Sequence, residues 1–335
     1  MNLATWSRRR TASLPSPPRC LPNKTNMAAR AGAALGAGAA AAAAAAYYDD
    51  DSRRSLLISG VGSVCRLFMR GLNNLTVHDA HHLEQGLSRP SGTALLTVSN
   101  HIATVDDPHL LASIVPLRTL LKPSEMRWGV CGDDVCFRPG TKLCRLADAA
   151  KVLPIRRGAG VWQPELDAII GKLEDGDWVH YFPEGKIRQD GRVHPFRRGV
   201  GRLVASINEP KSLQVVPFYH TGNDTLQPTT PTSKSLFSKP NLGTDIHVIF
   251  GPPVDLTRYL KLRDSPPFDR RPELLYEAIA HTLEDEVRAL RGRLHERLGI
   301  SPVIPKEGGC FDGDDAVLHP DAQPRQQQRG AAHGV

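Results

Sequence analysis

The sequence predicts an α/β fold, in which a mixed, mainly parallel sheet is flanked by helices and preceded by an N-terminal amphipathic helix. Short apolar runs that are typical of strands recur along the middle of the chain, and segments with helical periodicity lie between them. The runs lie at residues 94–99, 152–155, 178–182, 213–218 and 246–250, and the helical segments near 108–115, 164–174 and 199–207. This alternation favours a parallel sheet, because parallel strands need a crossover connection that is usually a helix.

The first segment of the chain, residues 1–48, differs in composition from the rest. It holds six basic and no acidic residues among Ser, Pro and Ala, including eight consecutive alanines. An acid-free, Arg-rich leader is typical of an organelle transit peptide. Low-complexity sequence without a targeting role is the alternative, and Met27 is a second possible start.

The first predicted helix covers residues 57–72. Its apolar residues recur at three- and four-residue spacing, and arginines surround them. The apolar set is Leu57, Val61, Val64, Phe68 and Leu72, and the arginines are Arg53, Arg54, Arg66 and Arg70. Such a basic amphipathic helix suits a position in the lipid headgroup layer, whereas an ordinary helix that covers the sheet has the same pattern. Both interpretations stay open.

The segment NHIATVDDPHL, residues 100–110, follows the strand at 94–99 directly. It puts His101 at the carboxyl edge of the sheet, where open α/β sheets place their sites. Asp106 can meet His101 only if a loop joins strand and helix, and the Asp-Asp-Pro sequence favours such a loop. A carboxylate there would hold one imidazole nitrogen and leave the other to take a proton from a hydroxyl. Helix capping by Asp106 is the alternative.

The six cysteines lie at positions 20, 65, 131, 136, 144 and 310 and form no C-x-x-C pair. Their spacing matches no structural zinc site, and a disulfide framework is not expected in a chain of this length. The sequence therefore predicts buried or idle thiols.

Two later strands also end in residues that suit a ligand. The strand at 152–155 ends with Arg156 and Arg157. The strand at 178–182 runs into Pro183, Glu184 and Gly185, a turn on which backbone amides and a carboxylate can face a ligand.

A basic run follows this turn. Residues 186–202 hold six basic residues and one acid, namely Lys186, Arg188, Arg192, Arg197, Arg198 and Arg202 against Asp190. The local net charge of +5 suits an anionic group such as phosphate. A solvated basic loop and helix is the alternative.

The end of the chain supplies one more helix and a tail. Residues 271–298 carry acids early and arginines late, the order that suits a helix dipole. Residues 303–335 are rich in Gly, Gln, Pro and Asp, which predicts a disordered tail. One folded domain is therefore expected between about residues 50 and 300.

The net charge of the whole chain excludes few classes of function, because most of it belongs to the first segment. The chain has 42 Lys and Arg against 35 Asp and Glu, a net charge of +7, and six of these basic residues belong to residues 1–48. Nucleic-acid binding is disfavoured, because no recognition motif is present and only 6% of residues are aromatic. No run of eighteen strongly apolar residues occurs, which disfavours a membrane-spanning helix and leaves in-plane contact as the expectation.

These patterns together resemble the four motifs of the glycerophospholipid acyltransferase family. His101 and Asp106 match its H-x-x-x-x-D motif, residues 152–157 resemble the second motif, residues 182–185 the third, and Val216-Pro217 the fourth. All four occur in the family's order. Shorter stretches at 126–128, 133–137 and 199–203 resemble a branch of the family that exchanges acyl chains between phospholipids and lysophospholipids.

The resemblance implies a glycerolphosphate acyltransferase-like fold and an acyltransferase domain at residues 50–300. His101 would be the general base that deprotonates the lysophospholipid hydroxyl, and Asp106 would orient it. The implied substrate-binding residues are Arg157, Glu184 and Gly185, with Arg156, Arg198 and Pro217 as further candidates. His109 is the rival base, and structural roles are at least as well supported for Asn100 and Asp107.

The branch also implies a reaction and a place. It implies transfer from a phospholipid such as phosphatidylcholine to monolysocardiolipin, without coenzyme A, any other cofactor or a metal, and hence cardiolipin remodelling. The expected location is a mitochondrial membrane, with peripheral or monotopic attachment facing the intermembrane space. The alternatives are an acyl-CoA-dependent lysophospholipid acyltransferase and a non-catalytic protein that binds anionic lipids.

Overall fold

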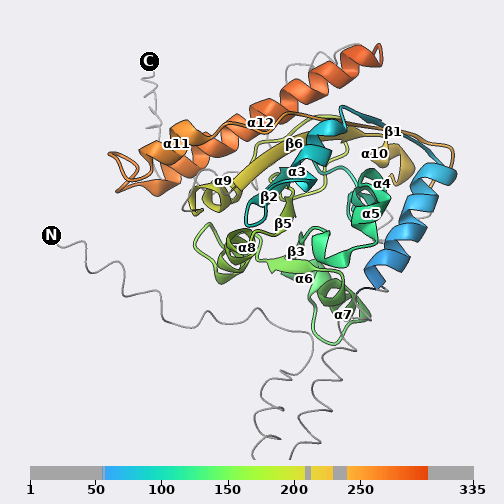
Figure 1. Cartoon of the computed structure of the whole chain (residues 1–335), viewed down its shortest axis with the longest axis horizontal. Helices are drawn as coiled ribbons and strands as arrows, with labels where there is room; N and C mark the ends of the chain where they lie inside the picture. The colour runs from blue at the N-terminus through green and yellow to red at the C-terminus, as the bar shows by residue number, and fades with distance from the viewer. Residues whose placement is uncertain (1–54, 56, 208–212, 229–239, 301–335) are drawn as a thin grey trace, which may run out of the picture.

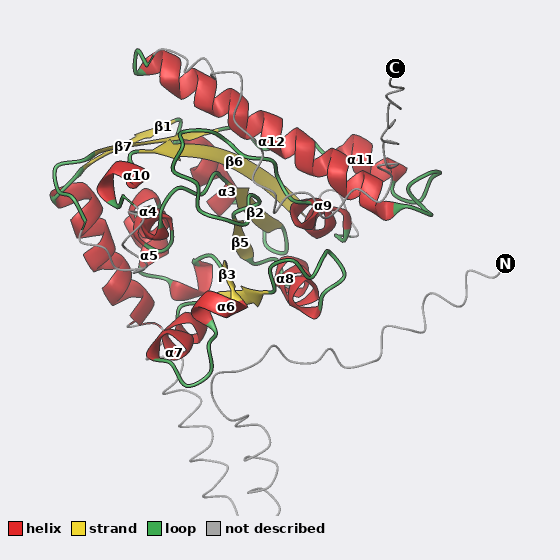
Figure 2. Cartoon of the chain, turned by 180° about the vertical axis from the view of Figure 1, so that it is seen from behind, coloured by secondary structure: helices red, strands yellow, loops and turns green. Residues whose placement is uncertain are grey.

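The computed structural model describes residues 55, 57–207, 213–228 and 240–300. The leader predicted at 1–48 and the tail predicted at 303–335 lie outside these residues. Within them, strands form the centre of the molecule and helices lie around them (Figures 1 and 2).

The main sheet has five strands in the order β1-β7-β6-β2-β5. They are β1 (Asn74–His78), β2 (Ala94–Val98), β5 (Trp178–Tyr181), β6 (Leu213–Thr221) and β7 (Asp245–Phe250). Three of the four neighbouring pairs are parallel, and β6 with β7 is antiparallel. The predicted mixed, mainly parallel sheet is therefore confirmed.

A second, smaller sheet consists of β3 (Gly129–Gly132) and β4 (Val152–Ile155), which pair in parallel. Trp128 joins it to the main sheet: its N–H donates to Trp178 O at 2.7 Å, and its carbonyl accepts from His180 N at 2.9 Å. The strand at 152–155 thus forms as predicted, but its carboxyl end belongs to this smaller sheet. Arg156 and Arg157 therefore do not stand on the edge of the main sheet.

Helices cover both faces of the main sheet. Those nearest to the predicted spans are α4 (His109–Ile114), α8 (Pro164–Glu174), α9 (Arg198–Ala205) and α12 (Pro272–Arg297). The others are α3 (His81–Leu87), α5 (Leu117–Leu120), α6 (Asp133–Cys136), α7 (Lys142–Ala149), α10 (Asn223–Leu226) and α11 (Thr257–Leu262), with 3-10 turns η3 (Thr104–Asp106) and η4 (Pro123–Glu125).

The alternation along β2 shows how the two cores are divided. Ala94, Leu96 and Val98 are fully buried in a core shared with α8, α9 and α12. Leu95 points into the other core, which α3, α4 and the helix at 57–71 complete. Because both faces are covered, the strand is apolar on both sides and lacks the alternation of a half-exposed strand.

The helix at residues 57–71 has two apolar faces. Ile58, Cys65 and Met69 are buried in the core. Val61 and Val64, from the stripe singled out in the sequence, are 42% and 68% exposed. The helix therefore covers the core with one face and leaves Val61 and Val64 of the neighbouring stripe on the surface, whereas Phe68 of the same stripe packs against the core. Within the described residues no helix is both long enough and apolar enough to cross a bilayer.

One expectation about cysteines was wrong. Cys131 and Cys136 form a disulfide, with their Cα atoms 6.1 Å apart. The short turn α6 between them brings the two side chains together, which spacing along the sequence does not reveal. Cys65 is a free, buried thiol, as expected.

The contact between α9 and α12 gives a testable prediction. A methyl group at Gly201 would overlap the backbone carbonyl of Tyr276, which cannot move aside without shifting α12. We expect Gly201→Ala to lower the free energy of unfolding by about 1–3 kcal/mol. Gly171→Ala is the matched control, because nothing lies within 4 Å of the added carbon in α8 and alanine favours a helix. Urea denaturation of both variants measures the difference, and equal stability would contradict the tight helix crossing.

Candidate active site

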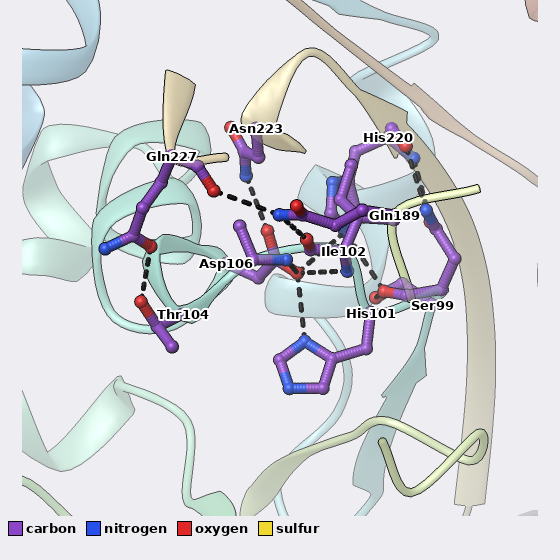
Figure 3. A network of polar contacts seen from close by, with 11 residues as sticks. Ser99, His101, Ile102, Thr104, Asp106, Gln189, His220, Asn223 and Gln227 are labelled. Carbon is purple, nitrogen blue, oxygen red and sulfur yellow. Dashed lines mark hydrogen bonds and ion pairs between the residues drawn. The ribbon is translucent and has the colours of Figure 1, made fainter. Parts of the chain in front are cut away.

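His101 and Asp106 meet at the carboxyl end of β2. His101 Nδ1 lies 2.9 Å from Asp106 Oδ2 (Figure 3). The loop that the Asp-Asp-Pro sequence predicted is formed by η3, which turns the chain back so that the two side chains face each other. The sequence-based expectation that they meet through a loop is confirmed.

Asp106 shapes this loop itself. Its Oδ2 accepts the backbone N–H groups of Ile102 at 2.8 Å and Ala103 at 2.9 Å. These bonds reach back three and four residues along the chain, so the same carboxylate that holds His101 also closes the turn that presents it. The alternative that Asp106 caps the following helix is wrong, because among the described residues no side-chain hydrogen bond caps the start of α4.

The carboxyl group of Asp106 is fully buried and remains ionised. Burial alone raises its pKa, but the nearby His220 and the bond from His101 outweigh this effect, and the pKa lies below the ordinary value. An ionised carboxylate only accepts hydrogen bonds, so His101 Nδ1 carries a proton. The other ring nitrogen, Nε2, is then the basic one, and the side chain is 20% exposed.

The ring of His101 is also held on its face. Phe182 stacks on it with the ring centroids 4.0 Å apart and the planes 14° apart. His180 lies edge-on to Phe182 and is fully buried, and burial keeps its pKa well below the ordinary value. The imidazole of His101 is thus fixed by a carboxylate at one nitrogen and by an aromatic ring on its face.

The turn after β5 lies beside this loop. The backbone N–H of Arg188 donates to His101 O at 2.9 Å. Gly185 has φ of 72°, a conformation that favours glycine, and a side chain there would meet Arg197. The guanidinium of Arg197 donates to Glu184 O at 3.2 Å. The structure therefore brings Glu184 and Gly185 together with His101.

Glu184 has an unusual carboxyl group. The residue is 5% exposed, and no side chain in the described part of the chain bonds its carboxylate oxygens. The backbone N–H groups of His194 and His101 approach the carboxyl group and favour its charged form, but burial outweighs them. Burial raises its pKa to about 8. At neutral pH the group is therefore mostly protonated, and it can donate a hydrogen bond as well as accept one.

The other predicted substrate ligands lie apart from this pair or are engaged by acids. Arg157 forms a two-pronged contact with Asp134 at 2.8 and 3.0 Å. Arg156 contacts Glu165 at 3.1 Å. Arg198 contacts Glu277 of α12 at 2.7 Å. Pro217 is a buried strand residue of β6 that pairs with Val98.

The basic run at 186–202 is likewise divided by the fold. Arg198 and the buried Arg202 have acidic partners from α12 and α8. Among the described residues, Lys186, Arg188 and Arg197 have no acid within ion-pair distance. The cations that the backbone ties most closely to His101 and Glu184 are Arg188 and Arg197. The sequence placed both in the basic run, but nothing in it distinguished them from Arg198.

The neighbours of the His101–Asp106 pair have structural partners. Asn100 exchanges two hydrogen bonds with the backbone of His220, at 2.9 and 3.1 Å. Asp107 forms an ion pair with the buried Arg127. The rival base His109 packs its ring edge-on against Phe68, and burial lowers its pKa. No group of three or more His, Cys, Asp and Glu side chains within the described ranges is placed to hold a metal ion.

Comparison with known proteins identifies the class. The family model described as Acyltransferase matches residues 74–221, which run from β1 to the end of β6 and include the His101 loop and the turn at Glu184. The fold and this match define an acyltransferase domain.

Curated relatives show which acyltransferases the chain is similar to. The chain is 33% identical over 208 residues to N-acylphosphatidylethanolamine synthase of Arabidopsis thaliana, covering 60% of this chain and 70% of that protein. It is 32% identical over 244 residues to tafazzin of Drosophila melanogaster, covering 71% of this chain and 61% of the relative. A solved structure, the 1-acyl-sn-glycerophosphate acyltransferase PlsC of Thermotoga maritima, matches 69% of this chain and 78% of its own with a TM-score of 0.42 and 17% identity.

The chain belongs to the glycerophospholipid acyltransferase superfamily. Within it, the chain is similar to tafazzins from three organisms, at 26–32% identity. It spans less than two thirds of the length of the Drosophila tafazzin.

Proposed function

We propose that this protein transfers an acyl chain from a phospholipid to the free hydroxyl of a lysophospholipid, without coenzyme A. The observation that carries the proposal is the buried carboxylate of Asp106 on His101 Nδ1, which leaves Nε2 as a base on a partly exposed ring. Similarity to tafazzins supports cardiolipin remodelling, with monolysocardiolipin as acceptor and mitochondrial membranes as the site.

In this reaction no enzyme nucleophile is required. His101 Nε2 takes the hydroxyl proton while the acceptor oxygen attacks the carbonyl carbon of the donor ester. The bond from that carbon to the donor's glycerol oxygen then breaks, and the imidazolium returns the proton to this leaving oxygen. Asp106 stabilises the imidazolium between the two steps. One ester bond forms and one breaks, so the exchange needs no thioester or other co-reactant.

The protonated Glu184 suits the acceptor side of the site. Its O–H can donate to a phosphate or hydroxyl oxygen of a lysophospholipid, and Arg197 beside it adds positive charge. We therefore assign acceptor binding first to Glu184, Gly185 and Arg197. Arg157 is a weaker candidate, because its Nε and Nη2 groups already bond Asp134.

The exposed stripe of the helix at 57–71 supports in-plane membrane contact. Val61, Val64 and Leu67 are exposed, and α5, which contacts this helix through Ser59 and Leu120, adds exposed Leu117 and Leu121. These side chains form an apolar surface without a membrane-spanning segment.

This surface gives a prediction. We expect the double substitution Val64→Glu with Leu67→Glu to weaken binding to cardiolipin-containing vesicles by about tenfold or more, because it removes two apolar side chains from the contact. Leu262→Glu, on the distant α11, is the matched control and should bind as the wild type does. Co-sedimentation with vesicles measures both, and equal binding of all three proteins would reject this surface.

The transfer itself is tested with defined lipids. Purified protein, phosphatidylcholine and monolysocardiolipin in mixed vesicles should yield cardiolipin and lysophosphatidylcholine with no thioester added. A strict requirement for acyl-CoA would reject the coenzyme-free reaction and support the acyl-CoA-dependent alternative with the same His101 chemistry.

A second candidate acceptor is an amine. The similarity to N-acylphosphatidylethanolamine synthase covers 70% of that protein, a larger share than is covered of the Drosophila tafazzin. His101 could remove a proton from an ammonium group in the same position as a hydroxyl. Vesicles that contain both phosphatidylethanolamine and monolysocardiolipin distinguish the two, because mass spectrometry separates an N-acylated product from cardiolipin.

A further inference from the structure

Asn223 contacts Asp106 from the side away from His101. Its Nδ2 donates to Asp106 Oδ1 at 2.7 Å, and both side chains are fully buried (Figure 3). The other oxygen, Oδ2, serves His101 and the backbone N–H groups of Ile102 and Ala103. The two carboxylate oxygens therefore have separate tasks, and among the described residues Oδ1 is bonded by Asn223 alone.

The orientation of the Asn223 amide follows from its partner. An ionised carboxylate has no proton to give, so the NH₂ end of Asn223 faces Asp106 and the carbonyl end faces away. This carbonyl oxygen, Asn223 Oδ1, is buried and has no hydrogen-bond partner among the described residues. An unpaired buried acceptor is unfavourable, because it has lost its hydrogen bonds to water without gaining others. A polar side chain at this position is thus poorly explained by fold stability alone.

The backbone before Asn223 is bent so that the amide reaches the loop. Gly222 has φ of 96°, and a side chain there would overlap the carbonyl of Asp245 in β7. The chain therefore turns sharply where β6 ends. Two residues earlier, His220 is tied to Asn100 through its backbone, which fixes the end of β6 against the end of β2.

The end of α10 (Asn223–Leu226) is fixed to the loop that carries His101 and Asp106. Gln189 donates to Ile102 O at 2.7 Å and to Gln227 O at 2.9 Å, and Thr104 donates to the side chain of Gln227 (Figure 3). Asn223 therefore approaches Asp106 from a segment that the site holds at both ends.

We propose that Asn223 is a positioning residue, which acts on the reaction by fixing the carboxylate of Asp106 and dispersing its charge. The inference rests on the proposed function of His101 and Asp106. The hydrogen bond from the Asn223 amide hinders rotation of the carboxylate about the Cβ–Cγ bond of Asp106. It also moderates how strongly Asp106 attracts the proton of His101. Without it the protonated imidazole is favoured, and a larger share of the enzyme lacks the free base at a given pH.

The test replaces Asn223 with a side chain of similar size that cannot donate. We expect Asn223→Leu to lower kcat in the phosphatidylcholine to monolysocardiolipin assay by about 10- to 100-fold, the range seen when hydrogen-bond partners of metal ligands are removed. KM should change by less than about threefold, because Asn223 does not touch the substrate. The acidic midpoint of the kcat profile should move up by about 0.5–1 pH unit.

The other titratable and charged groups around the pair stay in place in this variant. They are His180, Glu184, His220, Asp107 and Arg127. A shift in the acidic midpoint of the kcat profile therefore reports the loss of the hydrogen bond from Asn223 to Asp106.

Asn241→Leu is the matched control. Asn241 is exposed, and its amide donates to Thr225 O at 2.7 Å on the same segment, so its replacement removes a similar bond outside the site. This variant should keep the wild-type kcat and midpoint.

Three results would overturn the inference. They are an unchanged kcat in Asn223→Leu, a loss that matches the unfolded fraction measured by thermal melting, or a loss with an unmoved midpoint. If Asn223→Leu does not fold, Asn223→Asp replaces the donor with an acceptor of the same size, and wild-type turnover at pH 7 and above would equally overturn it. His101→Ala separates the hypotheses: retained turnover there rejects the proposed function, whereas lost turnover there with a normal Asn223 variant rejects only this inference.

Discussion

Replacing His101 with Ala is expected to lower turnover by about a thousandfold, within the range that general acid–base catalysis contributes. The loss should appear in kcat, because in the proposed reaction the imidazole acts on the reacting hydroxyl and contributes little to lipid binding. The variant should remain folded, since the ring is partly exposed and the loop is closed by bonds from the backbone to Asp106. The thioester-free assay measures the loss, and vesicle co-sedimentation should show wild-type binding.

His109 provides the matched control for this experiment. It lies in the same motif, but its ring packs against Phe68 of the helix at 57–71. His109→Gln should therefore retain turnover within a few-fold. If His109→Gln removed turnover and His101→Ala did not, the roles assigned to the two histidines would be reversed. Unchanged turnover in both would reject each histidine as the general base, whereas absence of turnover in the wild type, with vesicle binding retained, would favour the non-catalytic lipid-binding alternative.

Replacing Glu184 with Gln is expected to change how stability depends on pH. Folding raises the pKa of Glu184 from 4.5 to about 8 because it buries the carboxyl group. Between these values the unfolded chain loses the proton while the folded protein keeps it. The contribution of the protonated carboxyl group to the free energy of unfolding is therefore fully present below pH 4.5. It is lost as the pH rises towards 8.

The expected size of this effect is large. The free energy of unfolding of the wild type, relative to that of Glu184→Gln, should fall by up to about 4 kcal/mol between pH 5 and 8, at 1.36 kcal/mol for each pH unit. Urea denaturation at several pH values measures it. Glu174→Gln, at the exposed end of α8, controls for the loss of one negative charge. A difference that does not vary with pH would show that Glu184 is ionised in the folded protein.

The same variant tests the role of Glu184 in acceptor binding. An amide donates and accepts as a protonated carboxyl group does, so Glu184→Gln should keep most activity at pH 7, whereas Glu184→Leu should raise KM for the lysophospholipid. The wild type should lose acceptor affinity as the pH passes about 8, and Glu184→Gln should lack this alkaline loss. Equal KM values in Glu184→Leu and the wild type would remove Glu184 from the acceptor site.

The parts of the fold that the sequence predicted are those with strong local signals. The five apolar runs form strands because burial on both faces requires apolar side chains. β1 and β3 were missed because the first is half-exposed and polar at its start and the second contains two glycines in four residues. The place of β4 in a separate sheet depends on its pairing with β3, and Trp128 joins that sheet to β5; neither contact leaves a pattern in the sequence.

The candidate site likewise has features that the sequence could predict and features that it could not. The meeting of His101 with Asp106 was predictable because it depends on bonds within six residues. The partners of Arg157 and Arg198 were not predictable, since Asp134 and Glu277 come from elements 23 and 79 residues away in the sequence. Asn223 lies 117 residues after Asp106, and only the sheet order, which places β6 next to β2, brings them together.

The helix at 57–71, which is buried on one face and apolar on part of its exposed face, also restricts how the molecule can bind to a surface. Its inner side chains seal the core, and Arg66 bonds the carbonyls of Ser113 and Val115 at 3.1 and 2.7 Å. A surface that takes up the outer stripe therefore cannot draw the helix away without opening the domain. Whatever binds there therefore acts on the folded domain as a whole, because the helix that carries the stripe is part of the same core as the strand that leads to His101.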